Sequence, residues 1–427
     1  MHKRFFLILF IIIFVTANPF AGFADTEEGI GVGAASKVPA PAISAPSAIL
    51  MEADTGQVLY YKDSDRYLHI STACKVMTIL VAIENADLYS NVTISADTAL
   101  TEGSALNLEI GAKYTLVDLL YAVMLTSAND AAIAIAEHVS SGNIDKFIDK
   151  MNETAEKLQM KNTHFSNATG LYDASQYTTA NDIALLIKYA INNPTFNKLF
   201  SSRSRPWYGT GGEAQILTNS NKLFWSYNGF EGGKIGYNDK NRQTIICTAA
   251  RTNMHLICVI LDAPADIMYD DAAALFDYGF DNFWKSTLVK KGDLLKTEEL
   301  DGKPIRLISQ SDIMYIHPIG ENYIKEFSAT ANLTLPLKTT IPSGSAKYVL
   351  EDGTVVEIGL YPETDIVPPD DMWTTIRKKV NENKDIFMLV IVLLAIEALL
   401  LMFNLGRLLG KLFVTVRKLY DRRKRTE

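Results

Sequence analysis

The amino-acid sequence predicts an α/β domain, followed by a small all-β domain and one membrane-spanning helix. Three observations support this fold class. Residues 47–285 mix the helical and strand periods of apolar residues. Residues 386–405 contain an apolar run that reaches the length of a spanning helix. Residues 286–367 have the pattern of short strands between Gly, Pro and Asp turns, at 305–308, 329–335, 346–350 and 354–358.

The composition is that of a globular protein. Of 427 residues, 48% are hydrophobic and 21% are charged, which excludes a chain that is disordered, collagen-like or coiled-coil throughout. The net charge of −8 is unevenly spread, because residues 406–427 contain eight Lys or Arg and two Asp or Glu. This tail carries +6, so the remaining residues carry −14. An acidic body with a short basic tail argues against nucleic acid as the main partner.

The first 24 residues have the pattern of a signal peptide. Lys3 and Arg4 precede an apolar run over residues 5–15, and Ala24 ends a small-residue cleavage motif. The run is short for a spanning helix, so we expect cleavage after export, with an uncleaved anchor as the alternative. Residues 25–46 are rich in Ala, Pro and Ser and are predicted to be a linker.

The C-terminal segments predict how the chain sits in a membrane. A polar stalk over residues 368–385 leads into the predicted helix 386–405, and the basic tail 406–427 follows it. Because basic flanks stay on the cytoplasmic side, we expect a single-pass protein whose folded body lies outside the cytoplasm. Glu397 interrupts the apolar run. One interpretation of Glu397 is a functional carboxylate within the membrane. The alternative is a structural side chain that is protonated or packs against a partner helix.

The sequence shows no pattern of a metal site or a cofactor site. The three cysteines form no CxxC pair, the six histidines lie far apart, and no glycine-rich nucleotide motif is present. Cys247 and Cys258 flank a predicted hairpin, where either a disulfide or two buried free thiols would fit.

The first segment that suggests chemistry is a helix predicted to start near Ser71 and Thr72. Apolar residues at positions 76, 79, 80 and 83 recur at helical spacing. Lys75 lies one turn from either hydroxyl, and a hydroxyl beside a lysine at a helix N-terminus is one design for an activated nucleophile. The alternative is an ordinary N-cap hydroxyl with an exposed lysine.

The second segment is a break between two helices. Two apolar helical runs within residues 115–142 flank the sequence Ser127-Ala128-Asn129-Asp130. Ser127 and Asn129 are expected to project from the break, and Asp130 fits the N-cap of the second helix. The alternative is an ordinary helix–helix turn.

The third segment is a predicted hairpin. Residues 229–249 and 255–261 predict a strand, a turn at 238–241, and two further strands. The first strand holds Lys234 between glycines, with Gly236 two residues further on. Glycine lets another backbone lie against a strand, and an edge strand with a lysine suits an extended peptide that ends in a carboxylate.

The order and spacing of these segments resemble the SxxK, SDN and KTG motifs of penicillin-binding proteins and serine β-lactamases. Over roughly residues 45–405 the chain is similar to the D-alanyl-D-alanine carboxypeptidase family, the low-molecular-weight penicillin-binding proteins of peptidase S11. The similar stretches include 47–66, 113–142 and 160–186. The resemblance implies a transpeptidase-like α/β fold, in which an antiparallel sheet with helices lies beside a helical subdomain, and the small β domain and membrane helix follow.

The resemblance also implies roles for the first two segments. Thr72 would be the nucleophile, and Lys75 the base that deprotonates it. Ser127 and Asn129 would relay protons and hold the substrate amide. The backbone N–H of Thr72 would be one oxyanion donor. The implied substrate is the D-Ala–D-Ala end of a peptidoglycan stem peptide, and β-lactams would be covalent ligands.

The third segment would hold the substrate, and it departs from the family. Lys234 would pair with the terminal carboxylate, and Gly236 would leave room for the peptide backbone. Ile235 stands where the family has a hydroxyl residue that helps to hold that carboxylate. Thr72 is a second departure, because the family has serine there and the added methyl group must fit a packed site.

The resemblance therefore predicts a membrane-tethered D-alanyl-D-alanine carboxypeptidase that forms an acyl-enzyme on Thr72. The two departures leave a second prediction open, a pseudoenzyme that binds stem peptides or an envelope partner. Ser71 and Cys74 are alternative nucleophiles that the helix register disfavours. Ser71 comes one residue early, and Cys74 lies about 200° around the helix from Thr72.

Overall fold

The computed structural model describes residues 30–31, 39–69, 71–209, 214–237, 242–264, 267–368 and 372–423. The predicted signal peptide, much of the linker, the turn at 238–241 and the end of the basic tail lie outside the described residues. The chain forms two compact units. The larger contains residues 1–293, 309–329 and 346–358, and the smaller contains residues 294–308, 330–345 and 359–427. The domain boundaries expected from the sequence stay predictions.

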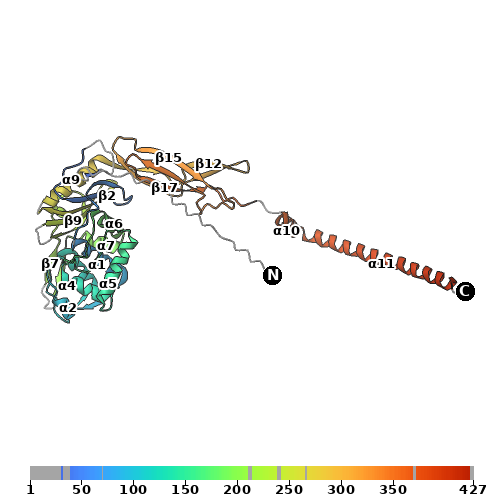
Figure 1. Ribbon diagram of the computed structural model, residues 1–427, viewed down its shortest axis with the longest axis horizontal. Helices are drawn as coiled ribbons and strands as arrows, with labels where there is room; N and C mark the ends of the chain where they lie inside the picture. The colour runs from blue at the N-terminus through green and yellow to red at the C-terminus, as the bar shows by residue number, and fades with distance from the viewer. Residues whose placement is uncertain are drawn as a thin grey trace, which may run out of the picture. The chain divides into compact units, whose positions relative to one another are not determined.

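The larger unit is built on a six-stranded antiparallel sheet (Figure 1). This sheet confirms the predicted α/β class. Its strand order is β1-β3-β2-β10-β9-β8, so β8, which holds Lys234, is an edge strand. The strands are β1 (Ile30–Gly31), β2 (Ser47–Glu52), β3 (Val58–Lys62), β8 (Phe230–Tyr237), β9 (Arg242–Arg251) and β10 (Met254–Pro264).

Helices cover both faces of this sheet (Figure 1). The helix α9 (Ile267–Asn282) packs on one face, and a helical region around α1 packs on the other. Residues 72–82 of α1 are all buried, as expected for a helix at the centre of a domain. The other helices are α2 (Ala96–Ala99), α3 (Leu116–Thr126), α4 (Asn129–Val139), α5 (Ile144–Lys157), α6 (Ala180–Ala190), α7 (Pro194–Phe200) and α8 (Leu223–Ser226), and α1 itself is Ser71–Asn85.

Alternate residues of the strands enter two separate apolar cores, because side chains point to opposite faces with a period of two. In β9, Ile246 joins the core on the α1 side, whereas Ile245 and Cys247 join the core on the α9 side. Cys258 of β10 lies directly opposite Cys247. Both cysteines, like Cys74, are buried free thiols, so the disulfide that the sequence left open is not formed.

Short antiparallel pairs of strands complete the larger unit. They are β4 (Asn91–Thr93) with β5 (Lys113–Thr115), β6 (Ser204–Tyr208) with β7 (Ala214–Thr218), and β11 (Phe283–Val289) with β14 (Ile313–Pro318).

The predicted small β domain contains a five-stranded sheet in the order β12-β13-β17-β16-β15. The strand expected at 329–335 is wrong in its bounds, because β15 begins earlier and ends at Ala331. Residues 332–336 lie outside the sheet. Pro336 has no N–H to donate to the hydrogen bonds between strands. The strands are β12 (Leu294–Leu300), β13 (Lys303–Ile308), β15 (Ile324–Ala331), β16 (Gly344–Leu350) and β17 (Val355–Pro362).

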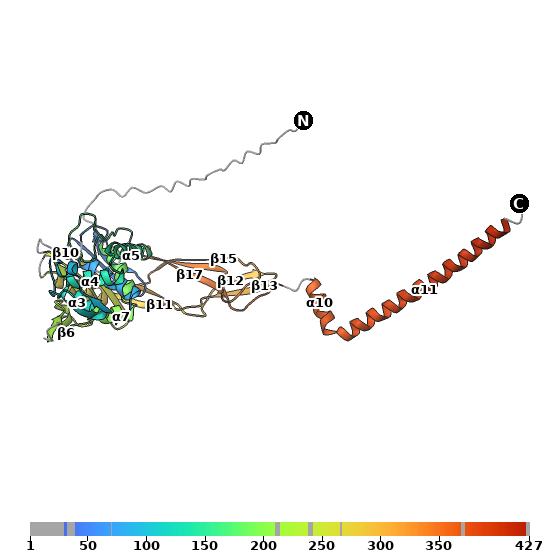
Figure 2. The ribbon, with the colours of Figure 1, turned by 90° about the horizontal axis from the view of Figure 1, so that it is seen from below.

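Two helices form the C-terminal part of the smaller unit (Figure 2). The first, α10 (Met372–Glu382), lies within the predicted stalk, and the second, α11 (Lys384–Arg423), contains the predicted membrane helix. Among the described residues, 384–417 is the one helical stretch that is long and apolar enough to cross a membrane. None of its most apolar part is buried by protein, so these side chains are free to contact lipid.

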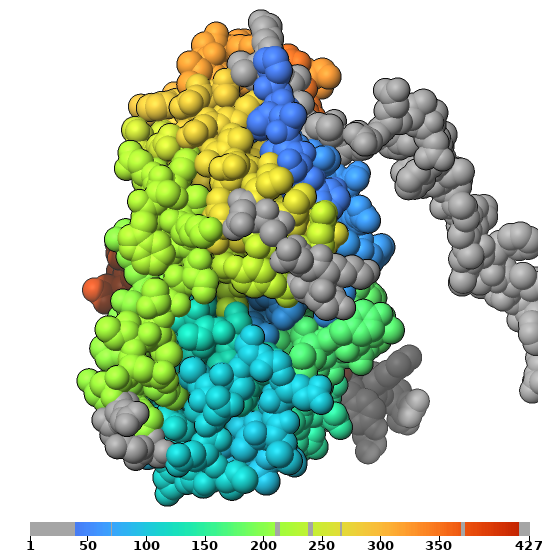
Figure 3. Space-filling model, turned by 90° about the vertical axis from the view of Figure 1, so that its left-hand side faces the viewer, coloured from blue at the N-terminus to red at the C-terminus, as the bar shows by residue number. Residues whose placement is uncertain are grey.

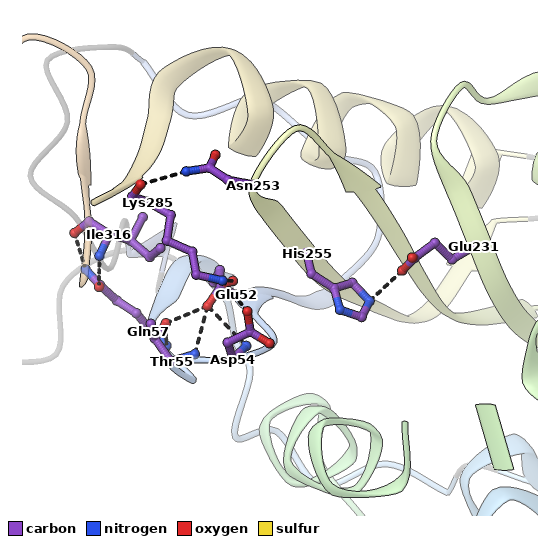
Figure 4. A network of polar contacts seen from close by, with 9 residues as sticks. All are labelled: Glu52, Asp54, Thr55, Gln57, Glu231, Asn253, His255, Lys285 and Ile316. Atoms are coloured by element: carbon purple, nitrogen blue, oxygen red, sulfur yellow. Dashed lines mark hydrogen bonds and ion pairs between the residues drawn. The ribbon is translucent and has the colours of Figure 1, made fainter. Parts of the chain in front are cut away.

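A buried ion pair ties the end of β2 to β11 (Figure 4). Lys285 Nζ lies 2.8 Å from Glu52 Oε1 and also contacts Asp54. Glu52 is fully buried, and Lys285 is only 9% exposed. Nearby, Gln57 donates to the carbonyl of Ile316 at 3.1 Å and accepts from its N–H at 3.0 Å. These contacts fix β11 and β14 against the hairpin of β2 and β3.

We expect Lys285→Met to lower the free energy of unfolding by about 3–5 kcal/mol, because Glu52 would stay buried without its cation. The double variant Glu52→Gln/Lys285→Met should lose less, since it leaves no uncompensated charge. Urea unfolding followed by circular dichroism measures both variants. A single variant as stable as the wild type would contradict this role of the pair.

Candidate active site

One pocket of about 490 Å³ collects the residues that the sequence singled out. It is lined by β8, by the N-terminal end of α1 and by the junction of α3 with α4. In the space-filling view, segments around residues 100–140 (cyan) lie against segments around residues 200–250 (yellow-green) (Figure 3). Every predicted site residue lines the pocket: Thr72, Lys75, Ser127, Asn129, Lys234, Ile235 and Gly236.

The Thr72 hydroxyl lies against β8. Thr72 is the second residue of α1 and is 3% exposed. A Cβ atom added to Gly236 would lie 1.9 Å from Thr72 Oγ1, which is far inside any van der Waals contact. Glycine is therefore required at position 236 by the close approach of the two elements, and not by an unusual backbone conformation.

Lys75 enters the pocket one turn further along α1. Its Nζ donates to Ser71 Oγ at 3.3 Å and to the carbonyl of Thr169. Burial lowers the pKa of Lys75 from 10.5 to about 8, because the charged form is desolvated. Near neutral pH a larger share of this amine is therefore neutral than in an exposed lysine, and a neutral amine can accept a proton. The hydroxyl that it contacts is that of Ser71, so both Ser71 and Thr72 stay candidates.

Cys74 does not line the pocket. Its Sγ donates to the carbonyl of Asn167 at 2.8 Å, and burial raises the pKa of the thiol to about 12. A thiol that holds its proton at neutral pH is a poor nucleophile. The geometry thus agrees with the register argument against Cys74.

Ser127 and Asn129 lie at a sharp break between two helices. α3 ends at Thr126, the next residue Ser127 has a left-handed backbone with φ of 59°, and α4 starts at Asn129. Asn129 Nδ2 donates to the carbonyl of Glu102 at 2.7 Å. Its Oδ1 is buried and has no hydrogen-bond partner among the described residues. A buried amide oxygen left unpaired is a strong acceptor for the N–H of a ligand.

The N-cap role predicted for Asp130 is wrong. α4 begins at Asn129, with Ala128 at the N-cap position, and Asp130 lies in its first turn. The carboxylate of Asp130 instead accepts from the backbone N–H groups of Leu106 and Leu108, at 3.0 and 3.1 Å. These hydrogen bonds tie the segment that follows Glu102 to the start of α4.

Lys234 connects the edge strand to this break. It is 2% exposed, and its Nζ donates to the carbonyls of Val123 and Met124, at 2.8 and 3.0 Å, and to Ser127 Oγ at 2.7 Å. The two carbonyls belong to the C-terminal end of α3, where the helix dipole favours a cation. Burial, and then the charge of Lys75, lower the pKa of Lys234 well below 10.5.

Ile235 lines the pocket, but its side chain is 6% exposed and packs in the apolar core on the α9 side. Arg242 also lines the pocket, although the sequence suggested no role for it. Its Nε lies 3.6 Å from Asp262 Oδ1. The period of two residues in a strand could have identified Arg242. Thr244 pairs with Gly236, and Arg242 precedes Thr244 by two residues, so Arg242 and Thr244 point to the face that holds the pocket.

The sequence did not point to several other lining residues, among them His69, Leu171 and Tyr172. These three come from segments without helix or strand, where no periodic pattern marks a face. The stretch 160–186 that resembles the family contains Leu171 and Tyr172, and His69 lies just before the predicted helix start at Ser71.

Residues 34–265 match the family described as D-alanyl-D-alanine carboxypeptidase, peptidase S11. The chain is 29% identical to D-alanyl-D-alanine carboxypeptidase DacF of Bacillus subtilis (strain 168), over 77% of this chain and 86% of that protein. It is 32% identical to D-alanyl-D-alanine carboxypeptidase DacB2 of Mycobacterium tuberculosis, over 58% of this chain and 86% of that protein. The solved structure of penicillin-binding protein 5 from Haemophilus influenzae shares the fold, with a TM-score of 0.68 and 24% identity over 78% of this chain and 100% of that one.

Proposed function

Because the chain belongs to the D-alanyl-D-alanine carboxypeptidase family, which acts on peptidoglycan, we propose that it removes the terminal D-Ala of stem peptides through an acyl-enzyme on Thr72. One observation carries the proposal: side chains from α1, the α3–α4 junction and β8 line a single pocket. They supply a hydroxyl, an amine with a lowered pKa and an unpaired amide oxygen. The apolar helix α11 would tether this site to the outer side of a cell membrane.

The reaction needs a proton acceptor beside the attacking hydroxyl. Neutral Lys75 takes the proton of Thr72 Oγ1 as the oxygen bonds to the carbonyl carbon of the penultimate D-Ala. The C–N bond then breaks, and the protonated amine returns the proton to the leaving D-Ala. Water attacks the carbonyl carbon of the resulting ester and gives a proton to Lys75. The bond from that carbon to Thr72 Oγ1 then breaks, and Lys75 returns the proton to Oγ1, which frees Thr72 and releases the shortened peptide. N–H groups in the first turn of α1 stabilise the oxyanion in both steps.

The other lining residues would hold the peptide. An extended stem peptide lies along the edge strand β8, where Gly236 leaves its path open. Asn129 Oδ1 accepts an N–H of the peptide, which gives this buried oxygen its missing partner. The terminal carboxylate lies toward the side chains of Lys234 and Arg242. A β-lactam would follow the same first step and stay bound as an ester.

One contact favours a second candidate, a pseudoenzyme that binds stem peptides or an envelope partner without turnover. Lys75 Nζ donates to Ser71 Oγ and to the carbonyl of Thr169. An amine engaged with these two groups would take the proton of Thr72 more slowly. The two functions differ in whether turnover depends on the hydroxyl at position 72.

We predict that Thr72→Ala abolishes release of D-Ala from a peptide that ends in D-Ala-D-Ala. Thr72→Ser should release it at least as fast as the wild type, and up to roughly tenfold to a hundredfold faster, because the methyl group crowds the site by about 1–3 kcal/mol. Steady-state kcat/KM measures both, and thermal unfolding checks that the variants fold. Activity that survives Thr72→Ala but is lost in Ser71→Ala would move the nucleophile to Ser71.

The rate should also rise with pH through a value of about 8, the pKa to which burial lowers Lys75. The group is a base only when neutral, and its proton leaves as the pH rises through this pKa, so kcat/KM should fall about tenfold per unit below it. A series from about pH 6 to about pH 10 on the free peptide measures this. A flat profile across that range would contradict Lys75 as the base.

A further inference from the structure

A group of aromatic side chains lies exposed beside the candidate active site. Tyr67, Tyr172 and Tyr177 are 60%, 80% and 39% exposed. Large apolar rings that gather in the open, instead of standing singly, mark a surface that binds something.

Ring contacts join these side chains into two groups, and a contact between Gln176 and His69 links the two. Tyr67 and Tyr177 meet edge to face with centroids 5.3 Å apart, and Tyr177 also packs against His164 at 6.1 Å. Tyr172 packs against His69 at 5.1 Å, and Gln176 Nε2, next to Tyr177 in the chain, lies 3.4 Å from His69 Nε2. We call the five rings the aromatic strip: Tyr67, His69, His164, Tyr172 and Tyr177.

The strip runs between two hollows. At one end, His69 and Tyr172 line the candidate active site. At the other end, His164 lines a second pocket of about 410 Å³, together with polar residues that include Asn152, Glu156 and Lys161. A ligand that is seated in the first pocket and continues out of it along the rings would therefore reach further polar groups.

The rings are held in place before any ligand arrives. Backbone bridges join Leu68 to Thr178 and His164 to Tyr177. The hydroxyl of Tyr67 donates to Asn162 Oδ1 at 2.7 Å. A surface fixed in this way loses little conformational entropy on binding, which favours a rigid, elongated partner.

We propose that the aromatic strip binds the sugar chain of peptidoglycan while the stem peptide occupies the pocket. The proposal rests on the proposed function, because a stem peptide seated in the pocket is covalently attached to its glycan. Sugar rings have apolar faces that stack on exposed aromatic rings, and polar edges that suit the hydroxyl, amide and imidazole groups along the strip. Asp173, which follows Tyr172, is an unsuitable neighbour for anionic lipid headgroups, since hydrogen bonds from Ser175 lower its pKa and keep it ionised.

The test uses the full-length protein in detergent and glycan strands from which the peptides have been removed by an amidase. Titration calorimetry should show binding by the wild type, and binding roughly tenfold or more weaker by Tyr67→Ala/Tyr177→Ala, because two stacking rings are lost. Tyr67→Phe should bind more tightly than the double Ala variant, because it keeps the stacking ring. Tyr89→Ala should bind like the wild type, because it removes a ring that is 77% exposed but lies beyond the other end of α1.

The outcomes separate this proposal from the proposed function. Release of D-Ala from a free peptide should be unchanged in Tyr67→Ala/Tyr177→Ala, whose residues do not line the first pocket. If the wild type releases no D-Ala but still binds the glycan through the two tyrosines, the proposed function fails and the strip stands. No binding of glycan by the wild type, equal binding by the double Ala variant, or an equal loss in Tyr89→Ala would overturn the proposal. Binding to phosphatidylglycerol vesicles would be measured in the same way. If the double Ala variant bound these vesicles more weakly than the wild type but bound the glycan equally well, the strip would be assigned to a membrane and the proposal would be overturned.

Discussion

The rest of the site depends on the hydrogen bonds that the buried amine of Lys234 makes to the end of α3. Lys234 extends from the edge strand β8 and is bound by two carbonyls at the end of α3 and by the hydroxyl of Ser127. These three hydrogen bonds join the edge of the sheet to the helical region. Because buried carbonyls without a donor are costly, the end of α3 cannot move away from β8 without a loss of stability. The break that presents Ser127 and Asn129 to the pocket is placed by these hydrogen bonds.

A second constraint is the tight fit around the N-terminal end of α1. Gly236 leaves space for the Thr72 hydroxyl on one side. On another side, a Cβ atom on Gly170 would lie 2.6 Å from Ser71 Cα, and the backbone there has φ of +75°. Two glycines far apart in the sequence thus pack closely against Ser71 and Thr72 and restrict where their hydroxyls can lie. The same close packing excludes water from Lys75, and that desolvation lowers its pKa.

Much of this arrangement could be predicted from local patterns. The apolar spacing after Ser71 places the start of α1, and the glycine-flanked Lys234 identifies an edge strand. The sequence does not reveal contacts between distant segments. Asp130 looks like a helix cap, yet the N–H groups of Leu106 and Leu108 compete for its carboxylate. The sequence does not reveal the aromatic strip for the same reason. A bridge between residues 68 and 178, which are far apart in the chain, brings Tyr67 and Tyr177 together.

The most direct test of the central claim is to find which atom forms a covalent bond with a substrate analogue. The full-length protein would be incubated with a labelled penicillin, digested, and mapped by tandem mass spectrometry. Our account predicts a single adduct on the peptide that contains residues 71–75, with fragment ions that place it on Thr72. An adduct on Ser71, or no adduct where a Thr72→Ser variant of the same fold does react, would contradict Thr72 as a working nucleophile.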